Sequence, residues 1–319
     1  MAKEAKMFAE RKKLIIAFLI PSSALYLIFF LVPALQSLFY SLFEWRGFGA
    51  DKEFIGLRNF QHLLDLRATF DGQFPFLHLN PRDAVFWVSM KTTLMYLLLG
   101  GVLTFTLAFL FTAMLSSGIR GKKFFRLIIF APNVVAAVAL ATLWGFIYNP
   151  RFGMLKGFFE ILGLEELAKT TWMGPGKIVF AVLIAMCWIW IGFYLVMLLA
   201  GVDQIPKEMF DAAKVDGANV FQIFTKVTIP LIWDVLSIAI IHFGIGALKV
   251  FEFPYVICGR LPPREIWTLG IYTYVMGFGK RDPIYRLGYS SAIGVIMQLL
   301  VIVLILIFAR VFRREAVEY

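Results

Sequence analysis

Long apolar runs alternate with short polar segments along the whole chain. Six runs are free or nearly free of charge, and each exceeds the about 20 helical residues that cross the roughly 30 Å hydrocarbon core of a bilayer. The pattern therefore predicts an all-α membrane protein with six transmembrane helices. The six runs are Leu14–Phe43, Thr92–Ile119, Leu127–Pro150, Ile178–Val202, Val227–Ile257 and Leu287–Ala309. Only the fifth is interrupted by charged side chains, at Asp234, Lys249 and Glu252.

Composition supports this assignment. Hydrophobic residues make up 60% of the 319 residues and the mean hydropathy is +0.79, which is more apolar surface than one soluble core could bury. The first run is too long for the 7–15-residue apolar core of a cleaved signal peptide, so it is expected to remain as a span. We expect one membrane domain over residues 14–310, with terminal tails of residues 1–13 and 311–319.

The distribution of basic residues predicts orientation. An even number of spans places both termini on one side of the membrane. The short segments "KEAKMFAERKK", "RGKKFFR" and "RVFRR" are dense in Lys and Arg close to span ends, where the positive-inside rule applies. Both termini are therefore expected in the cytoplasm, with the protein in the cell (inner) membrane. The net charge of +10 is then an orientation signal and a contact for anionic membrane lipid, not a nucleic-acid patch.

The residue patterns of common enzymes are missing from the sequence. A nucleotide-binding P-loop needs GxxxxGK[ST], and every Gly-Lys pair here lacks the upstream Gly and the following Ser or Thr. The histidines and the two cysteines are scattered, without the spacing of metal ligands. We therefore expect no catalytic residue, no metal site and no cofactor bound by this chain.

A short charged segment, "DQIPKEMFDAAKVDG", separates the fourth and fifth apolar runs. Its proline near the start, its early acidic residues and its closing Gly217 predict a helix of two to three turns. Met209, Phe210 and Ala213 would form its apolar face. On periodicity alone, an interfacial helix lying on the lipid headgroups is an equal alternative to partner docking. The pair Ala212-Ala213 favours close docking of a partner.

The longer stretch "IPKEMFDAAKVDGANVFQIFTKVTIP" resembles the EAA loop of membrane subunits of binding-protein-dependent ABC importers. In that family the pattern is E-A-A-x-x-x-G, followed by an aliphatic residue and a proline. Asp211 stands where the family usually has Glu. The resemblance implies that the cytoplasmic loop of residues 203–228 contains a coupling helix that docks on an ATPase. Its coupling residues would be Glu208, Asp211, Ala212, Ala213, Asp216, Gly217, Ala218, Phe224 and Pro230.

Further motifs are similar to those of the maltose-type sugar permeases: "FIGLRNF", "WGFIYNPRFGML", "FEFPYVICG", "TLGIYTY" and "LGYSSAIGV". One departure is Gly259-Arg260-Leu261-Pro262, where the family often has Gly-Gly-Pro. The resemblance implies a type I ABC importer permease fold and passage of a sugar, a di- or oligosaccharide. It also implies a second permease subunit, rather a paralogue than an identical copy, an extracytoplasmic binding protein, and two ATPase subunits that bind ATP and Mg.

Resemblance and chemistry together place the sugar between the fourth and fifth spans. Aromatic rings stack on the apolar faces of sugars, and charges within a span usually face a cavity or each other. Helix packing for the aromatics, and a structural salt bridge between Lys249 and Glu252, are the alternatives. The substrate-binding candidates are Trp188, Trp190, Phe193, Phe243, Gly246, Ala247, Lys249, Val250 and Glu252.

Three other functions compete with sugar import. The first is an ABC permease for a polyol or a glycerophosphate. The second is an ion-coupled secondary carrier, which would be expected to have broken helices and inverted repeats; the sequence indicates neither. The third is a membrane scaffold that recruits a soluble partner without transport.

Overall fold

The computed structural model describes residues 2–49, 51–69, 78–81, 83–117, 119–259, 262–279 and 285–312. These residues are mostly helical, with two short antiparallel pairs: β1 (Phe43–Glu44) with β2 (Glu53–Phe54), and β3 (Leu66–Thr69) with β4 (His78–Pro81). The chain forms two compact units. The first unit joins Met1–Asp65 to Thr273–Ile296, and the second joins Leu66–Tyr272 to Met297–Tyr319.

Five described helical segments are long and apolar enough to cross a membrane. The fourth predicted span agrees residue for residue with α9 (Ile178–Val202). The first span, Leu14–Tyr40, runs through α1 (Ala2–Tyr26), η1 (Leu27–Leu31) and α2 (Val32–Tyr40). The remaining three are α4 (Ala84–Ser116), the segment Trp233–Ile257, and α16 (Leu287–Val311).

The third predicted span is not straight. The helices α5 (Lys122–Phe130) and η2 (Ala131–Val134) meet α6 (Ala137–Ile147) at an angle of 104°. Pro132 lies in the 3-10 turn and Val135 is extended, so the chain leaves the helical conformation there. The segment counts as a sixth span only if the bent pair is one span.

The fifth span is also interrupted. The helix α13 (Trp233–Leu248) is followed by α14 (Glu252–Ile257), and Phe251 between them has φ −141° and ψ −58°, outside the helical region. Two of the predicted spans are therefore broken, although the sequence indicated no broken helix. Arg260 and Leu261, where the sequence departs from the family pattern, lie outside the described residues.

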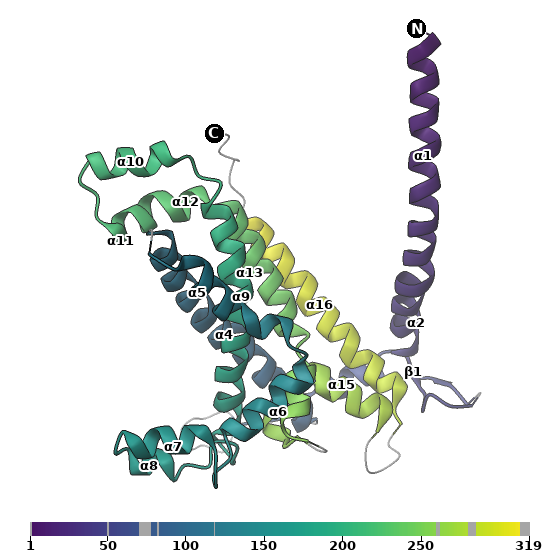
Figure 1. Cartoon of the computed structure of the whole chain (residues 1–319). Coiled ribbons are helices and arrows are strands. Elements are labelled where there is room, and N and C mark those ends of the chain that lie inside the picture. The colour runs from purple at the N-terminus through teal and green to yellow at the C-terminus, as the bar shows by residue number, and fades with distance from the viewer. Residues whose placement is uncertain are drawn as a thin grey trace. The chain divides into compact units, whose positions relative to one another are not determined.

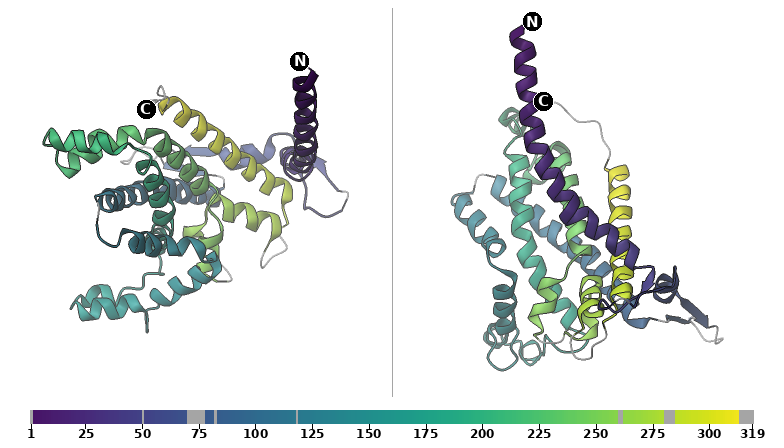
Figure 2. Two further views of the ribbon diagram at one scale, coloured as in Figure 1. Left: turned by 45° about the horizontal axis from the view of Figure 1, so that its top comes forward. Right: turned by 90° about the vertical axis from the view of Figure 1, so that its right-hand side faces the viewer.

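The core of the second unit is built around α9. Figures 1 and 2 show α4, α9 and α13 side by side, and aromatic rings of the three helices meet in the core. Phe105 contacts Tyr194 at 5.1 Å and Phe243 at 5.7 Å between ring centroids. All three rings are buried, so α9 is a closely packed central helix, and the broken spans pack against it.

The short helices of the second unit gather at opposite ends of this helix bundle (Figure 1). One end carries α10 (Lys207–Val215), α11 (Val220–Ile223), η3 (Phe224–Thr228) and α12 (Ile229–Leu231). The other end carries α7 (Met154–Ile161) and α8 (Glu165–Ala168).

The motif "FIGLRNF" lies in the first unit, where its asparagine has a structural role. Asn59, in α3 (Arg58–Leu64), is buried and its Nδ2 donates to the carbonyls of Ser41, at 2.9 Å, and Phe43, at 3.1 Å. Ser41 is the C-cap residue of α2 and Phe43 begins β1, so both carbonyls lie just beyond the last turn of the helix. The motif therefore fastens the following loop to the end of the first span.

Candidate functional site

A cavity of about 390 Å³ lies in the second unit where both broken spans face α9. Such volumes are typical of small-ligand sites. Its wall combines the η2 turn, the middle of α9 and the interruption between α13 and α14. The lining residues are Pro132, Asn133, Val135, Ala137, Leu140, Met186, Ile189, Trp190, Lys249, Val250, Phe251, Glu252 and Phe253.

The bend in the third span is held against α9 by one side chain. Asn133 Nδ2 donates to the carbonyl of Ile189 at 2.9 Å. The backbone approaches closely here, since a Cβ atom at Gly192 would overlap the carbonyl oxygen of Ile129 and lie 2.7 Å from Asn133 Nδ2. Gly192 is therefore required for the contact.

The interruption in the fifth span is held by the segment "TLGIYTY". The carbonyl of Val250 accepts a hydrogen bond from Thr268 Oγ1 at 2.6 Å, and the same oxygen of Thr268 accepts from the amide of Ile271 at 3.2 Å. Backbone groups freed at membrane depth must find such partners, because no water is available there. This segment continues into α15 (Leu269–Phe278), which follows the 3-10 turn η4 (Arg264–Ile266).

Lys249 and Glu252 both line the cavity without forming an ion pair with each other. The ion pairs found within 4.0 Å in the described part of the chain involve neither residue. The interruption removes the i, i+3 geometry of a continuous helix on which the salt-bridge alternative depended. Lys249 instead follows the C-terminus of α13 and Glu252 begins α14, so each charge complements a helix dipole.

Of the aromatic candidates, Trp190 lines the cavity. Its ring also meets the ring of Phe243 edge-on, with centroids 5.1 Å apart. Trp188 lies outside the cavity lining and contacts Trp144 at 5.6 Å. Phe193 stacks on His242, with ring centroids 5.1 Å apart.

The small and apolar substrate-binding candidates also divide into one that lines the cavity and others that lie outside it. Val250 lines the cavity. Phe243 and Ala247 are buried in the core between α4, α9 and α13, and Gly246 is exposed with no atom near the position of a Cβ. The structure thus brings four of the nine candidates together: Trp190, Lys249, Val250 and Glu252.

The sequence interpretation missed the contribution of the third span. Asn133 donates to α9 and lines the cavity. The available signal was "APN", a proline and a polar amide within an otherwise apolar run. A polar side chain at membrane depth usually has a partner inside the protein, so Asn133 could have been identified.

A second candidate site is α10 and the turn that follows. The amide of Ala218 donates to the carbonyl of Ala213, and the amide of Gly217 to that of Lys214, both at 3.0 Å. These two bonds and the φ of +77° at Gly217 form a Schellman C-cap. Asn219 then opens α11 in a capping box.

The predicted apolar face of α10, formed by Met209, Phe210 and Ala213, does not pack against the bundle as a whole. Phe210 and Ala213 are half-buried, and Phe210 packs against the core. Met209 and Val215 instead face outward and are 42% and 88% exposed. The other predicted coupling residues on the helix, Glu208, Asp211, Ala212 and Asp216, are exposed as well, whereas Phe224 is buried. One face of α10 therefore remains open to a partner.

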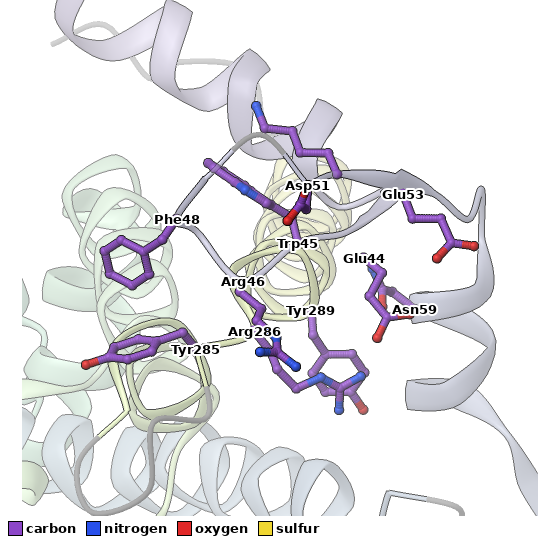
Figure 3. A pocket seen from close by; sticks show the side chains of 11 residues that line it. Glu44, Trp45, Arg46, Phe48, Asp51, Glu53, Asn59, Tyr285, Arg286 and Tyr289 are labelled. Carbon is purple, nitrogen blue, oxygen red and sulfur yellow. The ribbon is translucent and has the colours of Figure 1, made fainter.

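A pocket of about 820 Å³ lies within the first unit (Figure 3). Aromatic and charged side chains alternate around it. Lys52 Nζ stands 4.3 Å from the centre of the Trp45 ring, and the Arg286 guanidinium stands 4.5 Å from that of Tyr289. None of the predicted substrate residues lines this pocket.

Comparison with known proteins decides the family. Residues 105–317 match the family of binding-protein-dependent transport system inner membrane components. The chain belongs to this family. The permease is accordingly a non-catalytic membrane subunit, and the predicted transport function is confirmed at that level. The secondary carrier and scaffold alternatives are set aside, even though the spans are broken.

Individual relatives agree over nearly the whole permease. It is 29% identical over 317 residues to the trehalose/maltose transport system permease protein MalF of Thermococcus litoralis, covering 98% of each chain. It is 28% identical over 306 residues to the diacetylchitobiose uptake system permease protein NgcF of Streptomyces coelicolor, covering 92% and 81%.

A solved structure shows the fold. A chain of a bacterial ABC transporter involved in the import of the acidic polysaccharide alginate superposes with a TM-score of 0.78, at 20% identity, covering 98% of this permease and all of that chain. This confirms the predicted type I ABC importer permease fold.

Proposed function

We propose that the permease passes a sugar, a di- or oligosaccharide, through the cavity at the two span breaks. The observation that carries this proposal is the set of side chains found there. Lys249 can donate to hydroxyl groups, Glu252 can accept from them, and neither forms an ion pair with another described residue. Trp190 adds an aromatic surface of the kind that stacks on a sugar ring. The names of the relatives from Thermococcus litoralis and Streptomyces coelicolor support a sugar as the substrate.

We further propose that the energy of ATP hydrolysis reaches the permease through α10. Its outward face, with Met209, Ala212 and Val215, would dock on one of two cytoplasmic ATPase subunits, and the ATP and Mg would be bound there. The other ATPase would serve a second permease subunit, a paralogue of this one. An extracytoplasmic binding protein would deliver the sugar at the opposite end of the bundle, beside α7 and α8.

We propose that both termini then lie in the cytoplasm. This orientation is supported by the separation of α10 from α7 and α8 along the bundle (Figure 1) and by the basic segment that begins α5. The bilayer would then surround α4, α9 and α13 between these two ends.

The test is uptake by cells that carry single substitutions, normalised to the amount of permease in the membrane. Lys249→Met, Glu252→Gln and Trp190→Phe should reduce uptake unequally across maltose, trehalose, diacetylchitobiose and glycerol 3-phosphate, because each solute uses a different set of contacts. Trp188→Phe is the matched control outside the cavity and should leave the ranking unchanged. An even reduction for all four solutes would contradict the cavity assignment.

A further inference from the structure

A third cavity, of about 470 Å³, lies behind α10, on the side that faces the bundle. We call it the coupling-loop pocket. It is enclosed by the ends of α4 and α9, the start of α5, and α10 to η3.

The floor of the coupling-loop pocket is apolar. Leu115, Leu199, Val202 and Phe224 are buried, and Phe210 closes the pocket from α10. A small hydrated anion gains nothing from such a surface, whereas a hydrocarbon chain does. The floor therefore favours an amphiphile over a simple ion.

The rim carries two more cations than carboxylates. Asp203 is paired with Arg126 and Asp211 with Lys214, each at 3.2 Å. Lys122 and Lys207 line the pocket too, and the ion pairs of the described residues include neither of them. Two ammonium groups are thus left to attract an anion.

The pocket lies at the level where the spans end. Helix α4 ends at Ser116, α9 ends at Val202, and α5 begins at Lys122. In a bilayer, lipid phosphates occupy this level, and basic pockets between helices on the cytoplasmic side bind anionic headgroups.

We propose that the coupling-loop pocket binds an anionic phospholipid of the cytoplasmic leaflet. Lys122 and Lys207 contact the phosphate, and the upper part of an acyl chain lies on the floor against Phe210. The lipid then joins α5 to α10, so it steadies the coupling helix against the bundle. The leaflet named here rests on the proposed orientation of the permease.

The test uses the complete transporter purified with its partner subunits and placed in vesicles of phosphatidylcholine containing a photoreactive phosphatidylglycerol. Crosslinks should map to residues of the pocket. Lys122→Gln combined with Lys207→Gln should weaken labelling about thirtyfold, since each lysine near an anionic surface contributes about a fivefold gain in affinity. Lys123→Gln is the matched control, because Lys123 neighbours Lys122 but does not line the pocket, and it should label like the unaltered protein.

Three outcomes would overturn the lipid assignment. They are undiminished labelling of the double variant, an equal loss with Lys123→Gln, and displacement by soluble glycerol phosphate as effective as by phosphatidylglycerol. The last would mean that the site takes a free phosphorylated compound. The experiment is independent of the transport proposal, because labelling is measured without substrate. If the lipid is labelled but phosphatidylglycerol does not change the rate of ATP hydrolysis, the pocket binds the lipid. The proposal that the lipid steadies the coupling helix is then wrong.

Discussion

Thr268 and Val250 are joined by a 2.6 Å hydrogen bond from the threonine hydroxyl to the valine carbonyl. The bond crosses from the segment before α15 to the interruption between α13 and α14. Thr268 is fully buried, so no water can replace its hydroxyl. This contact therefore keeps the cavity-lining break of the fifth span in a single conformation.

Replacing this hydroxyl should destabilise the break. Thr268→Val leaves the carbonyl of Val250 without its donor and should lower the free energy of unfolding by about 1–3 kcal/mol. Thermal denaturation of the purified protein in detergent would measure it. Thr268→Ser keeps the hydroxyl and should lower the free energy of unfolding less. Thr142→Val removes an exposed hydroxyl bonded within its own helix and should have little effect. Equal losses at Thr142 and Thr268 would contradict the assignment.

The close approach at Gly192 gives a second prediction. Gly192→Ala would push a methyl group into the backbone of Ile129, and overpacking of this kind costs about 1–3 kcal/mol. The contact between Asn133 and α9 should loosen, lowering both stability and uptake. Gly145→Ala is the control, since nothing lies within 4 Å of its Cβ position in α6. A neutral Gly192→Ala would show that the bend does not depend on this approach.

The third prediction concerns the C-cap of α10. Gly217→Asp puts a side chain at a left-handed backbone position that favours glycine, and should fray the end of α10. We expect normal insertion but a lower rate of ATP hydrolysis stimulated by the binding protein. Gly163→Asp imposes the same strain, at φ +71°, between α7 and α8. It should leave hydrolysis unchanged; a matching loss there would argue against a coupling role.

Orientation can be checked by thiol labelling of intact cells. Lys52→Cys should react with a membrane-impermeant maleimide, whereas Val215→Cys, on the exposed face of α10, should react only after permeabilisation. The reverse pattern would invert the proposed topology.

The native thiol at Cys258 should interfere little with this labelling. Burial raises the pKa of Cys258 to about 11, so its reactive thiolate is scarce at neutral pH and increases as the pH rises toward 11. Its labelling rate in the unaltered protein, followed from pH 7 to alkaline pH, should therefore rise about tenfold per pH unit. Rapid labelling at neutral pH would contradict the half-buried placement of Cys258.

The sequence alone was sufficient for the approximate positions of the spans and for α10 as a helix. An uninterrupted apolar run has one stable arrangement in a bilayer, which is why α9 was predicted to the residue. Gly217 likewise marked the end of α10, because the left-handed turn there is a local property of glycine. These features depend on chemistry within a few residues of each position.

The cavity depended on contacts between distant residues. The bend of the third span is held by the bond from Asn133 to Ile189 and by the space at Gly192, and neither is visible from either segment alone. A salt bridge between Lys249 and Glu252 was an alternative to substrate contact because their spacing suits a continuous helix, but the fifth span is broken between them and the bond from Thr268 holds the break. The packing of α10 similarly turned Phe210 inward and Met209 outward. Periodicity describes a helix by itself, whereas the free energy of burying one face depends on what the rest of the chain brings against it.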